Sequence, residues 1–532
     1  MRQTGLGALA VVLAVLLASC GGGSSAQPAK LPPIHAGRVG PEAIFTPAGE
    51  LVLNPVGTLD ELQRLGVDTV HVYLHWADIA PDPTSSTKPV FDATDPAAYP
   101  ATGWAPYDTI VRDTKARGMG LILDLVPPPP HWASGKGAPD PATQPQWRPS
   151  APEYGQFVQA VATRYSGHYV PPGGSAPLPR VDFWSIWNEP NLGVELAPQA
   201  VPHTKIEVSG KLYRGLLNAA WNALGATGHG HDQIMIGELG PAGATFGNAP
   251  GLFAAMAPLR FVRALYCVDS SYQPLRGRAA QQRGCPTTAA GSKAFVAQNP
   301  GLFHATAFAD HPYSFGLPPD QGAPNEPDYT DLIEVPKLEH ALDTVQHAYG
   351  SDTRFQIYST EYGYQTSPPG PPSGTVSPAT AAYYLNWAEY LTWLNPRLRS
   401  YDQFLMTDGP GGYFTTGLKF PDGKPKPTYA AFRMPLYLPV RATAKGHPLV
   451  VWGDVRPAHN AQLASHRAQH VQIQFQPASG GAFKTVATVP ITDRYGYFEV
   501  PEKFPGSGNV RLAWSYPHGP QVLSRTVVVT LR

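Results

Sequence analysis

The sequence is poor in charge and has no excess of either sign. Charged residues make up only 15% of the 532 residues, and 39 basic residues balance 39 acidic ones. Nucleic-acid binding depends on a local excess of Lys and Arg that neutralises phosphates. The balanced charge therefore argues against nucleic acid as a partner, and it suits a neutral polymer such as a polysaccharide better.

The apolar stretch near the N-terminus is too short to span a membrane. It runs from Leu6 to Leu17 after one positive residue, Arg2, and leads into Leu17-Ala-Ser-Cys20. A spanning helix needs about 20 apolar residues, so this pattern is typical of a signal peptide. Its end resembles the bacterial lipoprotein processing site, which implies that Cys20 is lipidated and becomes the new N-terminus. An ordinary secretory signal with a chance cysteine is the alternative.

This interpretation places the protein at the bacterial cell envelope as a membrane-anchored lipoprotein, or outside the cell if no lipid is attached. We expect the signal segment to cover 1–20 and a flexible tether rich in Gly, Ser and Pro to cover 21–35. Neither segment is expected to belong to the folded part of the chain.

Cysteine is rare, with three residues in the whole chain. Besides Cys20 there are Cys267 and Cys285, which lie in a region rich in Pro, Gly and Arg. In an exported protein such a pair most simply forms a disulfide, which stabilises the fold by about 3 kcal/mol. Two thiols alone make a poor metal site, so we predict a structural bridge.

Motifs that bind metals or organic cofactors are missing from the sequence. We find no HExxH motif, no EF-hand loop and no Gly-rich phosphate loop after the first predicted strand. We therefore expect neither a metal nor an organic cofactor.

Apolar strand-like runs alternate with helical patterns over residues 36–436. About eight such units favour a closed (β/α)8 barrel, and an open doubly wound sheet is the alternative. The expected strands are 68–74, 120–125, 181–187, 233–237, 305–310, 356–360 and 401–405, with a first strand near 39–45. The expected helices are 59–65, 107–117, 154–165, 213–224, 331–349 and 379–394.

The last part of the chain, 437–532, has a different pattern. Apolar and polar residues alternate over 471–475, 510–514 and part of 526–531, and turn residues separate these runs. This pattern predicts a small antiparallel β-sandwich as an accessory domain.

Two glutamates, Glu189 and Glu361, each come just after an apolar strand-like run. Carboxylates on equivalent ends of parallel strands meet at one end of a barrel, where substrate can reach them. Cleavage of a glycosidic bond needs two such groups, because one protonates the leaving oxygen and the other attacks the sugar carbon.

Neighbouring side chains fit this chemistry. Asn188 precedes Glu189 and can donate to a sugar hydroxyl beside the reacting carbon, while His311 and Tyr313 follow the preceding strand. We expect a phenol hydrogen bond to orient Glu361 and to hold the pKa of that carboxyl low.

Three short motifs follow the fourth, sixth and seventh predicted strands: Trp187-Asn-Glu-Pro-Asn191, His311-Pro-Tyr313 and Thr360-Glu-Tyr-Gly363. Together they resemble the catalytic core of clan A glycoside hydrolases, closest to families 39 and 5. The resemblance covers about 36–436 and implies a (β/α)8 barrel that hydrolyses a carbohydrate with net retention. It implies Glu189 as acid/base, Glu361 as nucleophile and Asn188 as the hydroxyl-binding residue.

Further stretches look like the substrate-side loops of that clan. On this resemblance, Trp76, His131 and Trp132 would line the sugar cleft. Two departures stand out: His71 occupies the place of an arginine that usually contacts the nucleophile, and the segment Leu405-Met-Thr-Asp408 lacks the tryptophan that many members use as a sugar floor.

Two other functions share these features. A transglycosidase would have the same catalytic residues, and a non-catalytic carbohydrate-binding surface lipoprotein would keep the aromatic cleft without needing both glutamates. We expect a monomer, and the residue patterns leave the sugar and linkage open.

Overall fold

The computed structural model describes residues 33–35, 37–139, 144–244, 255–412 and 414–532. The predicted signal segment with Cys20, and residues 21–32 of the predicted tether, lie outside the described residues. Among the helices of the described part, none combines the length and the apolar character that crossing a bilayer requires.

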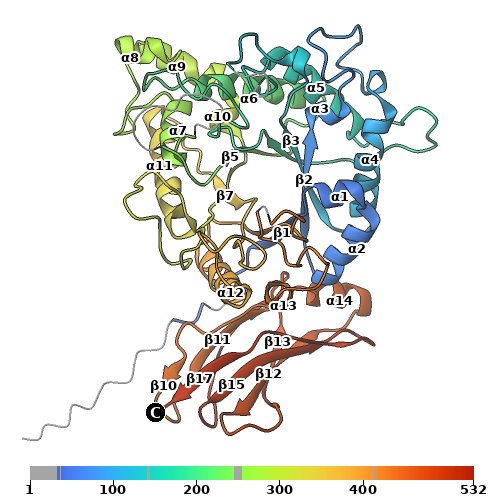
Figure 1. Cartoon of the computed structure of the whole chain (residues 1–532), viewed down its shortest axis with the longest axis vertical. Coiled ribbons are helices and arrows are strands. Elements are labelled where there is room, and N and C mark those ends of the chain that lie inside the picture. Colours follow the sequence, from blue (N-terminus) through green and yellow to red (C-terminus); the bar gives the residue numbers. More distant parts are fainter. Residues whose placement is uncertain (1–32, 36, 140–143, 245–254, 413) are drawn as a thin grey trace, which may run out of the picture.

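Eight parallel strands form the first sheet, in the order β7-β6-β5-β4-β3-β2-β1-β8 (Figure 1). The two ends of this order meet, because Ile357 pairs with Leu398 and the Phe404 amide donates to the Tyr362 carbonyl at 2.8 Å. The sheet is thus a (β/α)8 barrel, which confirms the predicted fold class. Its strands are β1 (Glu42–Thr46), β2 (Thr69–His75), β3 (Gly120–Val126), β4 (Phe183–Ile186), β5 (Gln233–Leu239), β6 (Ala307–Asp310), β7 (Gln356–Ser359) and β8 (Ser400–Phe404).

The barrel interior changes from apolar to polar along the strands. Its lower layer is a separate apolar cluster of Ile44, Ile122, Phe183, Met235, Ala307, Ala309 and Tyr358. Because side chains alternate between the two faces of a strand, the next inward residue lies two positions further on. On five strands that residue is polar: Thr46, Asp124, Ser185, His311 and Thr360. The apolar layer supports a buried polar layer near the carboxyl ends.

Helices cover the outside of the barrel. In α5 the buried residues Tyr154, Phe157, Val158 and Val161 recur at helical spacing, as the sequence predicted. The predicted helices correspond to α2 (Pro55–Leu65), α4 (Ala101–Ala116), α5 (Ala151–Arg164), α6 (Ser209–Ala226), α11 (Val335–Ala348) and α12 (Pro378–Leu394). Short helices that were not predicted are α1 (Gly49–Leu53), α3 (Trp76–Ile79) and α13 (Pro427–Arg433).

The described part of an insertion between β5 and β6 contains four further helices. They are α7 (Pro258–Leu265), α8 (Gly277–Gln282), α9 (Ala289–Gln298) and α10 (Pro300–His304). Cys267 and Cys285 form the predicted disulfide across this insertion, with both sulfurs in the buried core.

Two smaller sheets follow the barrel (Figure 1, orange to red). One has the order β10-β17-β15-β12-β13 with β16 beside β15, and the other β14-β11-β9. All pairs are antiparallel except β10 with β17, so the predicted sandwich contains one parallel edge. The elements are β9 (Leu436–Tyr437), β10 (Ala442–Thr443), β11 (Leu449–Asp454), α14 (Ala458–Ser465), β12 (Gln469–Pro477), β13 (Lys484–Ile491), β14 (Tyr497–Glu502), β15 (Gly508–Ser515), β16 (Gln521–Leu523) and β17 (Val527–Leu531).

The sandwich packs against the amino-terminal end of the barrel. A hollow there is lined by the first residues of β1, β2, β3 and β5 and by Arg494 and Tyr495 from the β13–β14 loop. Nearby, the buried Arg456 guanidinium donates to Glu389 of α12 at 2.5 Å and pairs with Asp454 at 2.9 Å. Charged groups thus join the two parts on the side away from the carboxyl ends of the strands.

Candidate active site

The carboxylates of Glu189 and Glu361 meet at the carboxyl end of the barrel. Glu189 follows β4 and Glu361 follows β7, and one oxygen of each lies within 4.8 Å of the other. The exposed fraction of the side chain is 16% for Glu189 and 8% for Glu361, so both are largely withdrawn from water. The strand topology brings together two acids that are far apart in the sequence.

Two tyrosines donate hydrogen bonds to Glu361. The Tyr313 hydroxyl donates to Oε2 at 2.9 Å, and the Tyr73 hydroxyl donates to Oε1. Tyr313 lies after β6, where the sequence placed it, whereas Tyr73 on β2 was not among the predicted site residues. The alternation of side chains along β2 could have identified Tyr73, because His71, Tyr73 and His75 share one face of that strand.

His311 connects three carboxylates. Its Nδ1 lies 2.9 Å from Glu189 and 3.7 Å from Glu361, and its Nε2 lies 2.9 Å from Glu238. Burial disfavours the charged ring, but the carboxylates, Glu361 first, raise the pKa of His311 well above its usual range. His311 is therefore an imidazolium that donates from both nitrogens.

Glu238 is a buried site residue that the sequence reasoning missed. It lies on β5 with no exposed surface and accepts hydrogen bonds from Ser185 and Thr360 as well as from His311. Burial opposes its charge, yet the His311 hydrogen bond and the charges of His71 and His311 bring the pKa of Glu238 below its ordinary value. Glu238 is thus a buried carboxylate that pairs with Nε2 of His311.

His71 lies in the polar layer below and does not line the cavity, in contrast to its prediction as a substrate-binding residue. Its Nε2 lies 3.6 Å from Asp124, and its Nδ1 lies 3.1 Å from the Thr46 hydroxyl. Burial lowers the pKa of His71, but the nearby carboxylates of Asp124 and Glu238 leave it raised, while burial raises the pKa of Asp124 to about 6.

Two groups of side chains have the ligand atoms for a metal ion. In each group, His71 with Asp124 and Glu238 or His311 with Glu189 and Glu361, three such atoms lie within 4.8 Å of one another. In both groups the carboxylates raise the histidine pKa, and ion pairs join the histidine to its neighbours.

The two glutamates line a cavity of about 490 Å³, which is large enough for a sugar unit. The Asn188 amide oxygen in this cavity is buried and, among the described residues, has no hydrogen-bond partner. Its lining residues are Tyr73, His75, Val126, Pro127, Asn188, Glu189, Leu192, Glu195, Pro241, Tyr313, Phe315, Glu361, Gly363, Gln365, Phe404 and Phe414. Phe404 and Phe414 contact each other edge to face and supply an aromatic wall where the sequence lacks the expected tryptophan.

The other aromatic residues predicted for the cleft lie elsewhere. Trp76 is completely buried and stacks on Phe157 of α5, so it belongs to the core. Trp132 packs partly buried against that core, and its indole donates to the Pro81 carbonyl at 3.0 Å. Neither these two nor His131 is among the described residues that line the cavity.

The electrostatic prediction for Glu361 was wrong in sign. The two phenols and His311 do lower the pKa of Glu361, but burial raises it by more, and Glu189 adds to the rise. The sequence argument counted the hydrogen-bond donors and left out the loss of water around the carboxyl.

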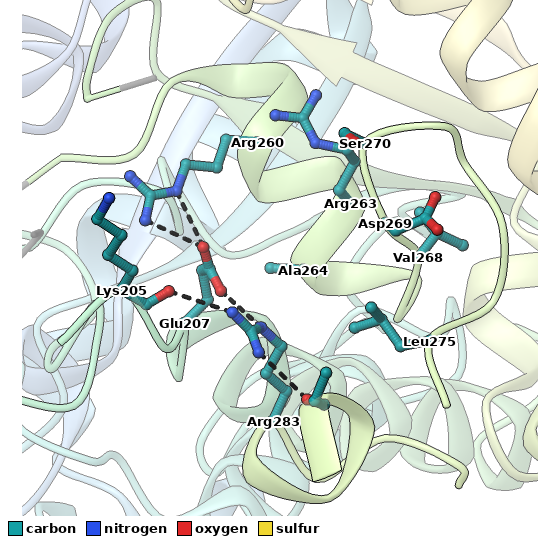
Figure 2. A pocket seen from close by; sticks show the side chains of 11 residues that line it. Lys205, Glu207, Arg260, Arg263, Ala264, Val268, Asp269, Ser270, Leu275 and Arg283 are labelled. Atoms are coloured by element: carbon teal, nitrogen blue, oxygen red, sulfur yellow. Dashed lines mark hydrogen bonds and ion pairs between the residues drawn. The ribbon is translucent and has the colours of Figure 1, made fainter. Parts of the chain in front are cut away.

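A second cavity, of about 380 Å³, lies beside the β5–β6 insertion (Figure 2). Its most prominent feature is Glu207, which accepts from Arg260 at 3.0 Å and from Arg283 at 2.7 Å (Figure 2). Arg283 also donates to the Ala279 carbonyl at 3.2 Å. This ion-pair cluster holds α7 and α8 against the chain before α6.

No family model matches the chain, and no curated protein matches it. Among solved structures, the chain is similar to a family 39 glycoside hydrolase from Bacteroides cellulosilyticus WH2, with 14% identity over 89% of this chain and 81% of that chain and a TM-score of 0.45. It is also similar to a glucosidase from Croceicoccus marinus (14% identity, 92% and 94% covered, TM-score 0.45) and to a GH30 endoxylanase from Clostridium papyrosolvens C71 (11% identity, 88% and 96% covered, TM-score 0.40). These neighbours are glycoside hydrolases, but similarity at this level carries no weight for function, which depends instead on the geometry of the site.

Proposed function

We propose that this protein is a retaining glycoside hydrolase that uses Glu361 as nucleophile and Glu189 as acid/base. The observation that carries the proposal is the approach of the two carboxylates to within 4.8 Å. Retaining enzymes hold their carboxyl groups about 5–5.5 Å apart, whereas inverting enzymes need roughly 6.5–9.5 Å to admit a water molecule.

The proposed reaction has two steps. First, Glu361 attacks the anomeric carbon while Glu189 gives its proton to the departing glycosidic oxygen, which leaves a glycosyl ester on Glu361. Then Glu189, now a carboxylate, takes a proton from water, the hydroxyl adds to the anomeric carbon and the Glu361 ester bond breaks. Both glutamates return to their starting states.

The surrounding residues hold the two acids in place. Tyr73 and Tyr313 hold both oxygens of Glu361, which orients the carboxylate toward the cavity. His311 donates to Glu189 at 2.9 Å and so fixes the second acid beside the first. Asn188 lines the cavity, and we propose that its side-chain amide binds a sugar hydroxyl.

Substitution of the two glutamates tests the proposal. We expect Glu361→Ala and Glu189→Gln each to reduce kcat on aryl glycosides by about 10²–10⁴-fold or more, because each removes a group that bonds to the reacting atoms. Added azide should restore turnover in Glu361→Ala by filling the space of the carboxylate. Circular dichroism and the melting temperature should match those of the wild type.

The stereochemistry of the product provides the second criterion. Proton NMR of the first product formed should show the anomeric configuration of the substrate. An inverted product, or full activity of either variant, would contradict the assignment.

The export signal and the lipid on Cys20, both predicted from the sequence, would place this activity at the bacterial cell envelope. Mass spectrometry of the N-terminal peptide of the purified protein measures that lipid.

A further inference from the structure

A third carboxylic acid, Glu195, lines the cavity that holds Glu189 and Glu361. It lies on the segment after β4, where the Leu196 amide donates to the Leu192 carbonyl at 2.9 Å and fixes the turn. Throughout the described part of the chain, no hydrogen bond or ion pair involves the Glu195 carboxyl. The proposed two-step reaction gives this residue no role.

The cavity has no side chain that suits an acidic sugar. None of its described lining residues is Lys or Arg, whereas three are glutamates. His311 is positively charged but is not among the described residues that line the cavity. Its charge is already shared by Glu189, Glu361 and Glu238. A uronate, sulfate or phosphate on the sugar would therefore meet negative charge and find no counter-ion.

The raised pKa of Glu195 also favours a positively charged ligand. Burial, and then the charges of Glu189 and Glu361, raise the pKa of Glu195 well above its ordinary value. Without a cation beside it, the Glu195 carboxyl is therefore favoured in its protonated form. A positively charged group beside it would reverse both effects, because it would stabilise the carboxylate and relieve the repulsion among the three acids.

We propose that the sugar bound in this cavity is a hexosamine with a free amino group, whose ammonium pairs with Glu195. This inference rests on the proposed function and narrows it to one substrate class. A neutral sugar can form hydrogen bonds to Glu195 as well as to Asn188 and Gln365, but only a cation also relieves the repulsion among the three acids.

Matched substrates test this inference. The probes are 4-nitrophenyl glycosides, in both anomers, of glucosamine and galactosamine, of their N-acetyl forms, of glucose and galactose, and of glucuronic acid. We expect kcat/KM to be about tenfold or more higher for the free amino sugars than for the N-acetyl and neutral forms, because only they offer the ion pair.

In Glu195→Gln this advantage should fall to about threefold or less. Asp422→Asn is the control for loss of one negative charge, since Asp422 is 52% exposed and pairs with Lys424. Asp422→Asn should keep the full preference for the free amino sugars. Isothermal titration of the wild type with methyl glucosaminide and methyl glucoside gives a readout that needs no turnover, and the amino sugar should bind about tenfold more tightly.

Three results would overturn the inference: equal kcat/KM for amino and N-acetyl sugars, preference for the uronide, or an amino-sugar preference that survives in Glu195→Gln. If neutral glycosides are cleaved and Glu361→Ala abolishes that cleavage, the proposed function stands although the inference fails. If no glycoside is cleaved, the proposed function fails, and the binding comparison still decides whether the cavity prefers an ammonium.

Discussion

At the scale of single residues, the site depends on strained backbone at two adjacent strand ends. Glu189 has a φ of 39° and Glu238 a φ of 44°, values that residues with a Cβ seldom adopt. The Glu189 amide donates to the Glu238 carbonyl at 2.9 Å, so the two strained residues hold each other. Such strain persists only where surrounding contacts fix it, and here it aims both carboxyls at His311.

The link from Glu238 through His311 leads to a prediction about pH dependence. The pKa of His311 is raised mainly by three carboxylates, so the imidazolium persists through neutral pH. Glu238→Gln removes one of them, and the pKa of His311 should fall toward its ordinary value. Above that lower pKa, Glu189 loses a charged donor and Glu361 a positive neighbour. We expect the basic limb of the kcat/KM profile to move down by about one pH unit.

Ser185→Ala is the matched control for Glu238→Gln. It removes one hydrogen bond to Glu238 and keeps the negative charge, so the basic limb should stay at its wild-type pH. If the basic limb of the Glu238→Gln profile stays at the wild-type pH and only the maximum of kcat/KM falls, Glu238 supports the fold without setting the pKa of His311.

The candidate site was predictable from sequence only in part, for reasons that differ among residues. Glu189, Glu361 and Tyr313 each follow a strand, and parallel topology alone brings such positions to one end of a barrel. Glu238 comes directly after the predicted strand 233–237, as Glu361 comes after 356–360, so the same signal was present in the sequence and was not used. Trp76 was misplaced because an aromatic residue after a strand packs equally well into a core or a cleft.

At the scale of secondary-structure elements, the strands were more predictable than the insertions. The barrel strands are largely buried, so most of them contain a short apolar run that sequence reveals directly, although β8 carries Asp402 and Gln403. The helices α8 and α9 of the β5–β6 insertion have few buried residues, and local periodicity therefore gives little signal. Contacts that are distant in sequence hold this region, among them the disulfide and the Glu207 cluster.

The disulfide allows a prediction about that insertion. Replacing both Cys267 and Cys285 by Ser should lower the free energy of unfolding by about 3 kcal/mol, because the bridge closes a loop with a sequence separation of 18. Denaturation with guanidinium, followed by tryptophan fluorescence, measures the change. Activity at 25 °C should persist because the catalytic strands do not include this loop. An unchanged midpoint would mean that the surrounding packing alone holds the insertion.

At the scale of the whole molecule, the sandwich supports the barrel and takes no part in the cavity. Trp452 and Trp514 of the sandwich are both buried, and the Trp514 indole donates to Gln469 at 3.2 Å. Gly66 at the end of α2 has a φ of 82°, and a Cβ there would lie 2.4 Å from the Arg456 carbonyl carbon. The close backbone packing at Gly66 and the buried ion pairs of Arg456 therefore hold the barrel and the sandwich together.

Removing one member of the buried charge cluster should loosen this junction. Arg456→Met leaves Glu389 and Asp454 buried without their cation, and we expect a loss of about 3–5 kcal/mol in unfolding free energy. Differential scanning calorimetry should show one transition in the wild type and an earlier, separate sandwich transition in the variant. Arg354→Met, at an arginine whose side chain is 71% exposed, is the control and should leave the trace unchanged. One undivided transition at the wild-type temperature would contradict this account of the junction.

The sandwich separates the beginning of the described chain from the cavity. The first described residues lie beside the sandwich, with the His35 amide bonded to Glu499 of β14 at 2.6 Å, whereas the cavity opens at the opposite end of the barrel. Any group attached ahead of these residues, such as the lipid proposed on Cys20, would therefore join the protein at the end remote from the opening through which substrate enters.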